Sequence, residues 1–131
     1  GCGTGILAIL AAKMKSATPV HAIDIDPTAV LSVRENAWKN RVHEKIDSRC
    51  GDASLIQAAK YDIILANINR NILLQDMATY TRGLLPGGVL VISGFYTQDL
   101  QMLTEEASGC GLEYEYHLEK ENWVAAKFTK K

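Results

Sequence analysis

The chain opens on a glycine-rich segment of the kind that binds nucleotides. Residues 1–5 read GCGTG, and an apolar run follows at once. Glycine permits a tight turn and a close approach of the backbone to a ligand, and the helix that follows offers free N–H groups to an anion. The dinucleotide-binding pattern GxGxxG has a glycine where this chain has Ile6. The spacing therefore favours a ligand without a pyrophosphate, and the alternative is a tight turn that binds nothing.

Three aspartates follow segments that read as strands. Asp24 ends the apolar run VHAID, about 20 residues after the glycines, where an acidic residue accepts hydrogen bonds from ribose hydroxyls in nucleotide-binding α/β domains. Asp26 precedes Pro27 and is the better helix cap. We therefore expect Asp24 to bind a ribose and Asp26 to cap a helix. Asp52 follows a further strand, where it either meets an adenine amine or serves as an ordinary turn residue.

Two amides follow the apolar run YDIILA. An amide side chain accepts a hydrogen bond from an amine and donates one to a neighbouring group, and it adds no charge that would keep an amine protonated. Asn69 fits the role of helix cap better than Asn67 does. Asn67 is therefore the candidate for orienting a reacting amine, and the alternative is a polar strand end.

The expected elements alternate between helix and strand. Helices are expected at residues 4–14, 27–40, 53–59, 71–85 and 99–108, strands at 20–24, 46–50, 61–66 and 89–93, and a loop at 15–19. The first helix and the strand at 61–66 are apolar on most sides, so both are expected to be largely buried. Residues 112–119 alternate between apolar and polar, and residues 123–128 return as a second strand. This order predicts an α/β domain with a mostly parallel sheet and a C-terminal antiparallel hairpin.

Composition narrows the class of protein. The chain has 131 residues, of which 47% are hydrophobic and 22% are charged, as in a single globular domain. Its net charge of -1 is not that of a basic nucleic-acid-binding domain, so we expect no direct binding to nucleic acid. The three cysteines are far apart, so we expect no metal site, and the three histidines are interpreted as structural or solvated. No signal peptide or membrane-spanning run is present, so we expect a cytoplasmic protein with no membrane partner.

Taken in order, the segments GCGTG, AIDIDP, GD, ANI and LLPGGVLVISG resemble class I S-adenosylmethionine-dependent methyltransferases. Within that class, GCGTGILAI, IDIDP, ANI and SGFYTQDL resemble the ribosomal protein L-eleven methyltransferase family. The resemblance implies a Rossmann-like three-layer sandwich and S-adenosyl-L-methionine as cofactor. It implies methyl transfer to lysine side-chain or N-terminal amines of a ribosomal protein of the large subunit. The alternatives are methylation of RNA or of a small molecule, and a cofactor-binding fragment without activity.

The resemblance also implies roles for individual residues. The implied cofactor-binding residues are Gly1, Cys2, Gly3, Asp24, Ile25, Asp52, Ala53 and Asn67. Asn67 and the backbone carbonyl of Ile68 would orient the amine, and no metal is implied. Members of the family have a central strand ending in an acidic residue before the first glycine, and an N-terminal substrate-recognition domain. Neither is part of this sequence, so we expect residues 1–131 to be a catalytic domain that begins inside its glycine-rich motif and is incomplete at the cofactor site.

Overall fold

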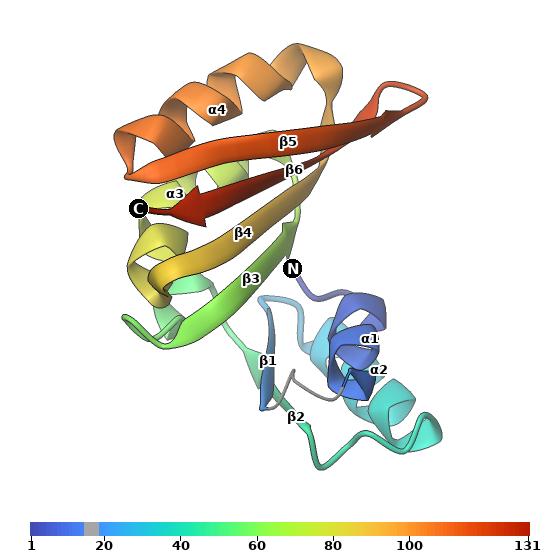
Figure 1. Cartoon of the computed structure of the whole chain (residues 1–131). Helices are drawn as coiled ribbons and strands as arrows, with labels where there is room; N and C mark the ends of the chain where they lie inside the picture. Colours follow the sequence, from blue (N-terminus) through green and yellow to red (C-terminus); the bar gives the residue numbers. More distant parts are fainter. Residues whose placement is uncertain (15–18) are drawn as a thin grey trace. The chain divides into compact units, whose positions relative to one another are not determined.

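The computed structural model describes residues 1–14 and 19–131, which form two compact units (Figure 1). The first unit, Gly1–Leu55, contains α1 (Ile6–Lys13), β1 (Val20–Asp24), α2 (Pro27–Lys39), β2 (Ile46–Cys50) and the 3₁₀ helix η1 (Ala53–Leu55). The second unit, Ile56–Lys131, contains β3 (Tyr61–Asn67), α3 (Arg70–Gly83), β4 (Leu84–Tyr96), the 3₁₀ helix η2 (Thr97–Asp99), α4 (Leu100–Gly109), β5 (Leu112–Lys120) and β6 (Trp123–Lys130). Apart from Pro19, the loop expected at 15–19 lies outside the described residues.

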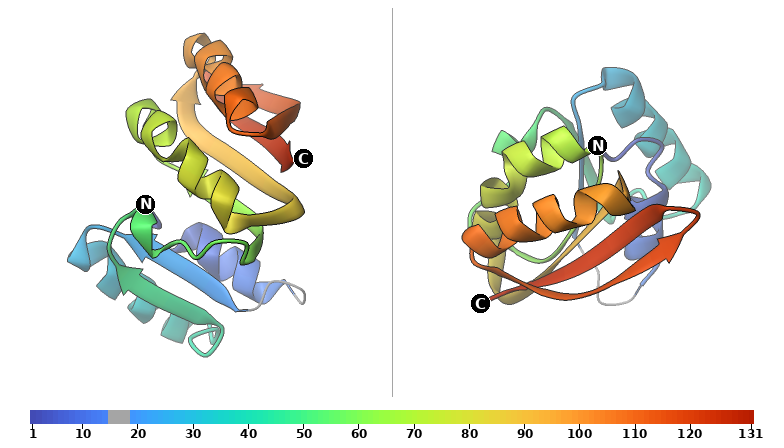
Figure 2. Two further views of the ribbon diagram at one scale, coloured as in Figure 1. Left: turned by 90° about the vertical axis from the view of Figure 1, so that its left-hand side faces the viewer. Right: turned by 90° about the horizontal axis from the view of Figure 1, so that it is seen from above.

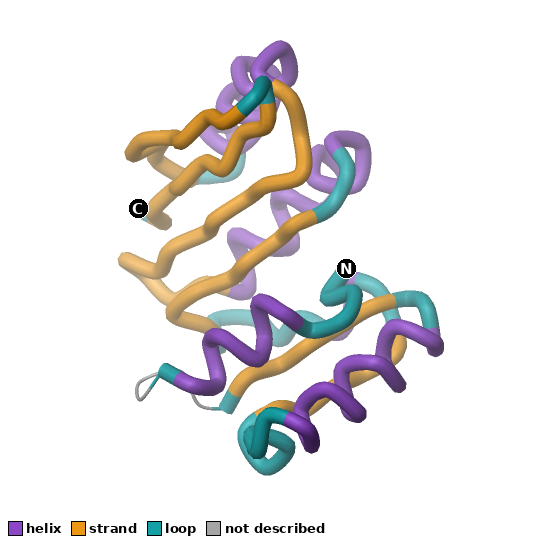
Figure 3. The backbone as a smooth tube through the Cα atoms, turned by 90° about the vertical axis from the view of Figure 1, so that its right-hand side faces the viewer, coloured by secondary structure: helices purple, strands orange, loops and turns teal. Residues whose placement is uncertain are grey.

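The first unit is a parallel pair of strands with the α1 and α2 helices on one face (Figure 3). The strands pair in register from Val20 with Ile46 to Asp24 with Cys50, so their carboxyl ends lie side by side. The α2 helix begins where it does because the Asp26 carboxylate accepts a hydrogen bond from the Thr28 N–H, at 2.9 Å. Its buried face consists of Val30, Val33 and Ala37.

The second unit is a four-stranded sheet in the order β3-β4-β6-β5. The β3 and β4 strands are parallel, and β6 runs antiparallel to both β4 and β5. The α3 and α4 helices lie on the same face of this sheet (Figure 2). Large side chains of the helices and strands are fully buried there, and each such apolar side chain contributes about 1.5–3 kcal/mol to folding. The set includes Leu73, Met77, Leu90, Ile92, Phe95, Leu103 and Phe128.

Most of the expected elements are confirmed. Both strands of the first unit have the predicted bounds, and the terminal hairpin is present as β5 and β6. The helix expected at 53–59 is wrong in extent, because only Ala53–Leu55 is helical. The prediction that the strand expected at residues 89–93 begins at Val89 is also wrong. The β4 strand already starts at Leu84, and its pairing with β3 shifts register between Leu84 and Val89, so the Pro-Gly-Gly segment lies inside an irregular part of the strand.

Burial differs from the expectation at two elements. In α1 the side chains of Ile6 and Leu10 are 66% and 57% exposed, and in β3 those of Ile63 and Leu65 are 59% and 43% exposed. Continuous apolar runs are buried when helices cover both faces of a parallel sheet. Here the helices of each unit lie on one face of its own sheet, and β3 is an edge strand of its sheet (Figures 2 and 3). The apolar pattern therefore predicted the elements correctly and overestimated their burial.

Candidate functional site

The glycine loop is attached to the end of β1 by backbone hydrogen bonds. Gly1 N and Cys2 N both donate to the carbonyl of Ile23, at 2.8 and 3.0 Å, and Gly5 N donates to the Cys2 carbonyl at 3.0 Å. Gly5 has φ +88°, and a Cβ at this position would lie 3.0 Å from Cγ2 of Val33 in α2. The third glycine thus allows a left-handed turn and close packing of α1 on α2, which is a structural role.

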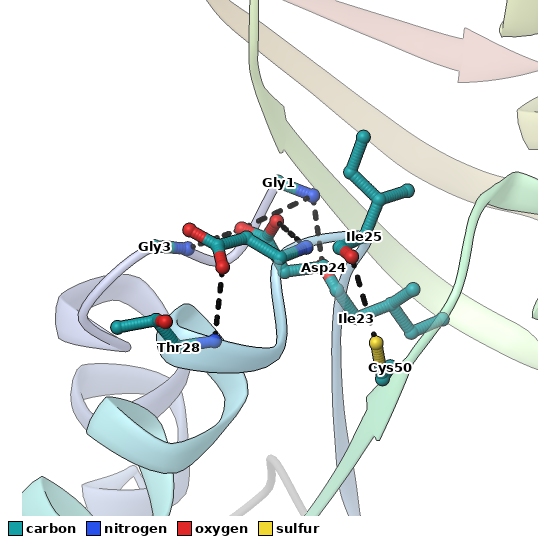
Figure 4. A network of polar contacts seen from close by, with 8 residues as sticks. Gly1, Gly3, Ile23, Asp24, Ile25, Thr28 and Cys50 are labelled. Carbon is teal, nitrogen blue, oxygen red and sulfur yellow. Dashed lines mark hydrogen bonds and ion pairs between the residues drawn. The ribbon is translucent and has the colours of Figure 1, made fainter.

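Asp24 is the centre of the polar contacts in the first unit (Figure 4). One carboxylate oxygen accepts a hydrogen bond from Gly3 N, and the other accepts one from Asp26 N, both at 3.0 Å. Partial burial raises the pKa of Asp24, but these N–H groups favour the anion more strongly, so its pKa lies below the usual value. Each carboxylate oxygen can accept a further hydrogen bond. Asp24 is therefore an anion held in place, with acceptor capacity left for hydroxyl groups.

Residues at the carboxyl ends of β1 and β2 also bond to one another. Gly51 N donates to the Asp24 carbonyl at 2.9 Å, and the Cys50 thiol donates to the Ile25 carbonyl at 3.5 Å. The Ile25 side chain is 70% exposed. Burial, together with the Asp24 carboxylate, raises the pKa of the Cys2 thiol and so favours its neutral form. These residues line one edge of the first unit.

Asp52 begins the 3₁₀ turn that follows β2. Its Oδ1 accepts hydrogen bonds from Ser54 N at 2.9 Å and from the Ser54 hydroxyl at 2.5 Å. These bonds lower the pKa of Asp52, which is exposed, so the carboxylate is ionised at neutral pH. Its other oxygen, Oδ2, has no hydrogen-bond partner among the described residues. Ala53 follows as the first residue of η1.

In the second unit, the two amides at and just after the end of β3 differ in their contacts. Asn69 caps α3, since its Oδ1 accepts a hydrogen bond from Ile72 N at 3.1 Å. Asn67 is exposed and ends β3 opposite Ser93 of β4, and Ile68 N donates to the Ser93 carbonyl at 3.2 Å. The structure therefore confirms that Asn69 is the cap, and it leaves the side chain of Asn67 available at a strand end.

Gly94 is a residue of this region that the sequence patterns did not single out. It has φ +87°, and a Cβ at this position would lie 2.6 Å from Oδ1 of Asn67. An isolated glycine inside a strand often marks a bulge or a close approach of another group, which is the signal that could have identified it.

All three histidines are predicted to be structural or solvated, and two of them have ring contacts or hydrogen bonds that fit this interpretation. His43 stacks on Trp38 with ring centroids 3.5 Å apart, and His117 bonds the Tyr114 hydroxyl and the Glu119 carboxylate, at 2.6 and 2.9 Å. Over residues 1–14 and 19–131, the side chains of His, Cys, Asp and Glu form no group of three or more that could hold a metal ion. Nor does that part of the chain contain a helix of sufficient length and apolar character to cross a bilayer.

Comparison with known proteins gives consistent matches. The family model described as "Ribosomal protein L11 methyltransferase (PrmA)" matches residues 1–131. Proteins named ribosomal protein L11 methyltransferase from Phocaeicola vulgatus and Porphyromonas gingivalis are 48% and 51% identical to the chain, over 132 and 130 residues. These alignments cover 100% and 98% of this chain but 46% and 44% of the relatives. The chain thus spans less than half the length of the curated relatives it matches.

Solved structures agree with the fold. The ribosomal protein L11 methylase of Lactobacillus delbrueckii subsp. bulgaricus has a TM-score of 0.93 and 26% identity, covering 100% of this chain and 67% of that protein. TYW2 of M. jannaschii, solved in complex with AdoMet, has a TM-score of 0.76 at 19% identity, with coverage of 99% and 66%, and shows the fold alone. Because the family model matches every residue and the relatives are about half identical, the chain belongs to the ribosomal protein L11 methyltransferase family.

Proposed function

We propose that the full-length protein is an S-adenosylmethionine-dependent methyltransferase that modifies lysine side-chain or N-terminal amines of a large-subunit ribosomal protein. The observation that carries the proposal is the family match over residues 1–131. The exposed amide of Asn67 at the end of β3 supports an amine as the acceptor. A ribosomal-protein substrate also supports a cytoplasmic location.

The first unit contains groups whose chemistry fits the cofactor. The Asp24 carboxylate is ionised and has capacity for the two ribose hydroxyls. The Asp52 carboxylate is exposed and ionised, so it can accept from the exocyclic amine of adenine. We assign the methionine part to the backbone of residues 1–3, and we assign Ile25 and Ala53 to the walls around the ribose and the adenine. When bound, S-adenosylmethionine supplies an electrophilic methyl group on its sulfonium sulfur.

In the second unit, we assign Asn67 and Ile68 to the reacting amine. The Asn67 amide oxygen and the Ile68 carbonyl would each accept an N–H bond from the amine, which leaves the nitrogen lone pair free to attack. A free lysine amine has a pKa of about 10.4, so it is mostly protonated at neutral pH. Asn67 carries no charge, and it therefore does not stabilise the protonated form as a carboxylate at the same place would.

We further propose that residues 1–131 are the catalytic part of a longer protein, in which a strand precedes Gly1. Among the described residues, β2 is the one strand that pairs with β1, so no strand lies along the other edge of β1. Gly1 N and Cys2 N already bond the Ile23 carbonyl near the end of β1. A strand leading into Gly1 would continue this pairing along β1 and support the glycine loop from behind.

The test is to incubate the full-length protein with isotopically labelled S-adenosylmethionine, ribosomal proteins and ribosomal RNA. We expect label on amine nitrogens of a large-subunit ribosomal protein, located by mass spectrometry of its peptides. Label in RNA or in a small molecule would show that the protein is a methyltransferase with a substrate other than the one proposed. Cofactor binding without any labelled product would overturn the proposal of an enzyme.

A further inference from the structure

We propose that Gly94 is a positioning residue for methyl transfer. Gly94 forms a bulge in β4, and because it has no side chain, it leaves room for the Asn67 side chain beside it. The inference rests on the proposed role of Asn67 and Ile68. It concerns the second unit alone, where β3 and β4 run side by side (Figure 1).

Gly94 is the extra residue of a β-bulge. Ser93 pairs with Ala125 of β6 and Phe95 pairs with Val124, so two consecutive residues of β6 face three residues of β4. Gly94 has φ +87°, a backbone conformation that side chains with a Cβ rarely adopt. The bulge comes directly after the pairing of Ser93 with Asn67, which is where β3 ends.

A side chain at position 94 would come close to both of the residues that we assign to the reacting amine, Asn67 and Ile68. A Cβ there would lie 2.6 Å from Oδ1 of Asn67, 3.2 Å from the Ile68 carbonyl oxygen and 3.3 Å from Ile68 N. Ordinary van der Waals contacts of a Cβ with another heavy atom are 3.4–4 Å. An alanine at position 94 would therefore push the Asn67 amide away by several tenths of an ångström.

The neighbouring backbone is less free to move than the amide. Ile68 N is bonded to the Ser93 carbonyl, and Asn69 is bonded to the first turn of α3. The Asn67 side chain is exposed and is therefore the group that yields. A displacement of about 1 Å in a group that orients a reactant costs about 100-fold in rate. Gly94 thus acts through Asn67 and does not itself touch the substrate.

Three variants of the full-length protein test this role. Gly94→Ala is expected to lower kcat by about 10- to 100-fold, while the dissociation constant for S-adenosylmethionine changes by less than about threefold. Gly87→Ala is the matched control, because Gly87 lies in the same strand with φ +80° and no atom lies within 4 Å of a Cβ there. It carries the same backbone strain without the clash, so kcat should stay near that of the unsubstituted protein.

The third variant combines Gly94→Ala with Asn67→Ala. If Gly94 acts through the Asn67 amide, the double variant has nearly the kcat of Asn67→Ala alone. Removing the amide also relieves the clash, so the melting temperature of the double variant should exceed the value expected from the two single changes.

The kcat values and melting temperatures of these variants distinguish a positioning role of Gly94 from a general effect of backbone strain. Equal losses of kcat in Gly94→Ala and Gly87→Ala, or kcat losses that multiply in the double variant, would overturn the proposal. If Gly94→Ala does not fold, recovery of folding in the double variant supports the proposal, and its absence rejects it. If the unsubstituted protein methylates nothing, the proposed function fails, whereas the coupling of melting temperatures between positions 94 and 67 still tests the contact.

Discussion

At the scale of single residues, hydrogen bonds stabilise the ionised form of two carboxylates of the first unit, Asp24 and Asp52. Asp24 receives two backbone N–H groups, and Asp52 receives the backbone and hydroxyl groups of Ser54. Both carboxyl groups have a pKa below the usual value, which is about 3.9 for an aspartate. Each can therefore accept hydrogen bonds from a ligand throughout the physiological pH range, so neither makes ligand binding depend on pH there.

Asp24→Asn should weaken the binding of S-adenosylmethionine to the full-length protein by about 10- to 100-fold. Hydrogen bonds to a charged group are worth about 1.5–3 kcal/mol, and an amide offers fewer acceptor sites than a carboxylate. Titration calorimetry measures the effect. The control is Asp26→Asn, which keeps the helix cap because Asn and Asp are equally good at this position. Equal losses in the two variants would reject the assignment of the ribose to Asp24.

Asn67→Ala should lower methyl transfer by about 100-fold and change cofactor affinity far less, because the amide orients the amine that attacks. Single-turnover rates and titration calorimetry on the full-length protein separate the two effects. Asn69→Ser is the matched control, since serine also caps a helix. Unchanged turnover in Asn67→Ala would show that the role given to this amide is wrong.

At the scale of elements, α3 connects the end of β3 to the rest of the second unit. Asn69 caps its N-terminus, and Arg70 Nη1 bonds the buried carboxylate of Asp99 at 2.9 Å. The segment after β3 is therefore tied to the segment after β4. This bond couples the start of α3, three residues after Asn67, to the residue that precedes α4.

The cap of α3 is expected to contribute to the stability of the second unit. Asn69→Ala should lower the free energy of unfolding by about 1 kcal/mol, because Ile72 N loses its acceptor, whereas Asn69→Ser should lower it by a few tenths. Urea unfolding of the full-length protein, followed by circular dichroism, provides the comparison. If alanine and serine were equally stable at this position, the side chain would not act as a cap.

At the scale of the whole molecule, the chain consists of two units, each with its own sheet. Apolar side chains of α1 and β3 are exposed, and among the described residues β1 and β3 each pair with a strand along one edge alone. Such edges and faces are normally paired or covered. These features support the proposal that further chain precedes Gly1 in the full-length protein.

The isolated chain, residues 1–131, should therefore bind S-adenosylmethionine at least about tenfold more weakly than the full-length protein does. In the isolated chain the glycine loop is bonded to β1 and, through the Asn36 side chain, to α2, but it lacks the proposed preceding strand, so more of the binding energy is used to order the loop. Titration calorimetry on both proteins under the same conditions makes the comparison. Equal affinities would mean that these 131 residues hold the complete cofactor site, and the proposed strand would then have no part in binding.

The sequence by itself determined the type and order of the elements, because these depend on local patterns. Alternation in residues 112–119 predicted the hairpin, Asp26 before Pro27 predicted the start of α2, and Asn69 was recognised as a better cap than Asn67. The family followed from motifs in their order, and the comparisons confirm it.

Only the tertiary structure decided burial and the contacts between segments far apart in sequence. The apolar runs of α1 and β3 look buried in sequence, but burial depends on what covers them. The hydrogen bond between Gly3 and Asp24 and the approach of Gly94 to Asn67 join residues more than 20 positions apart. No local pattern encodes such distances, because they arise from the pairing of strands and from where each strand ends.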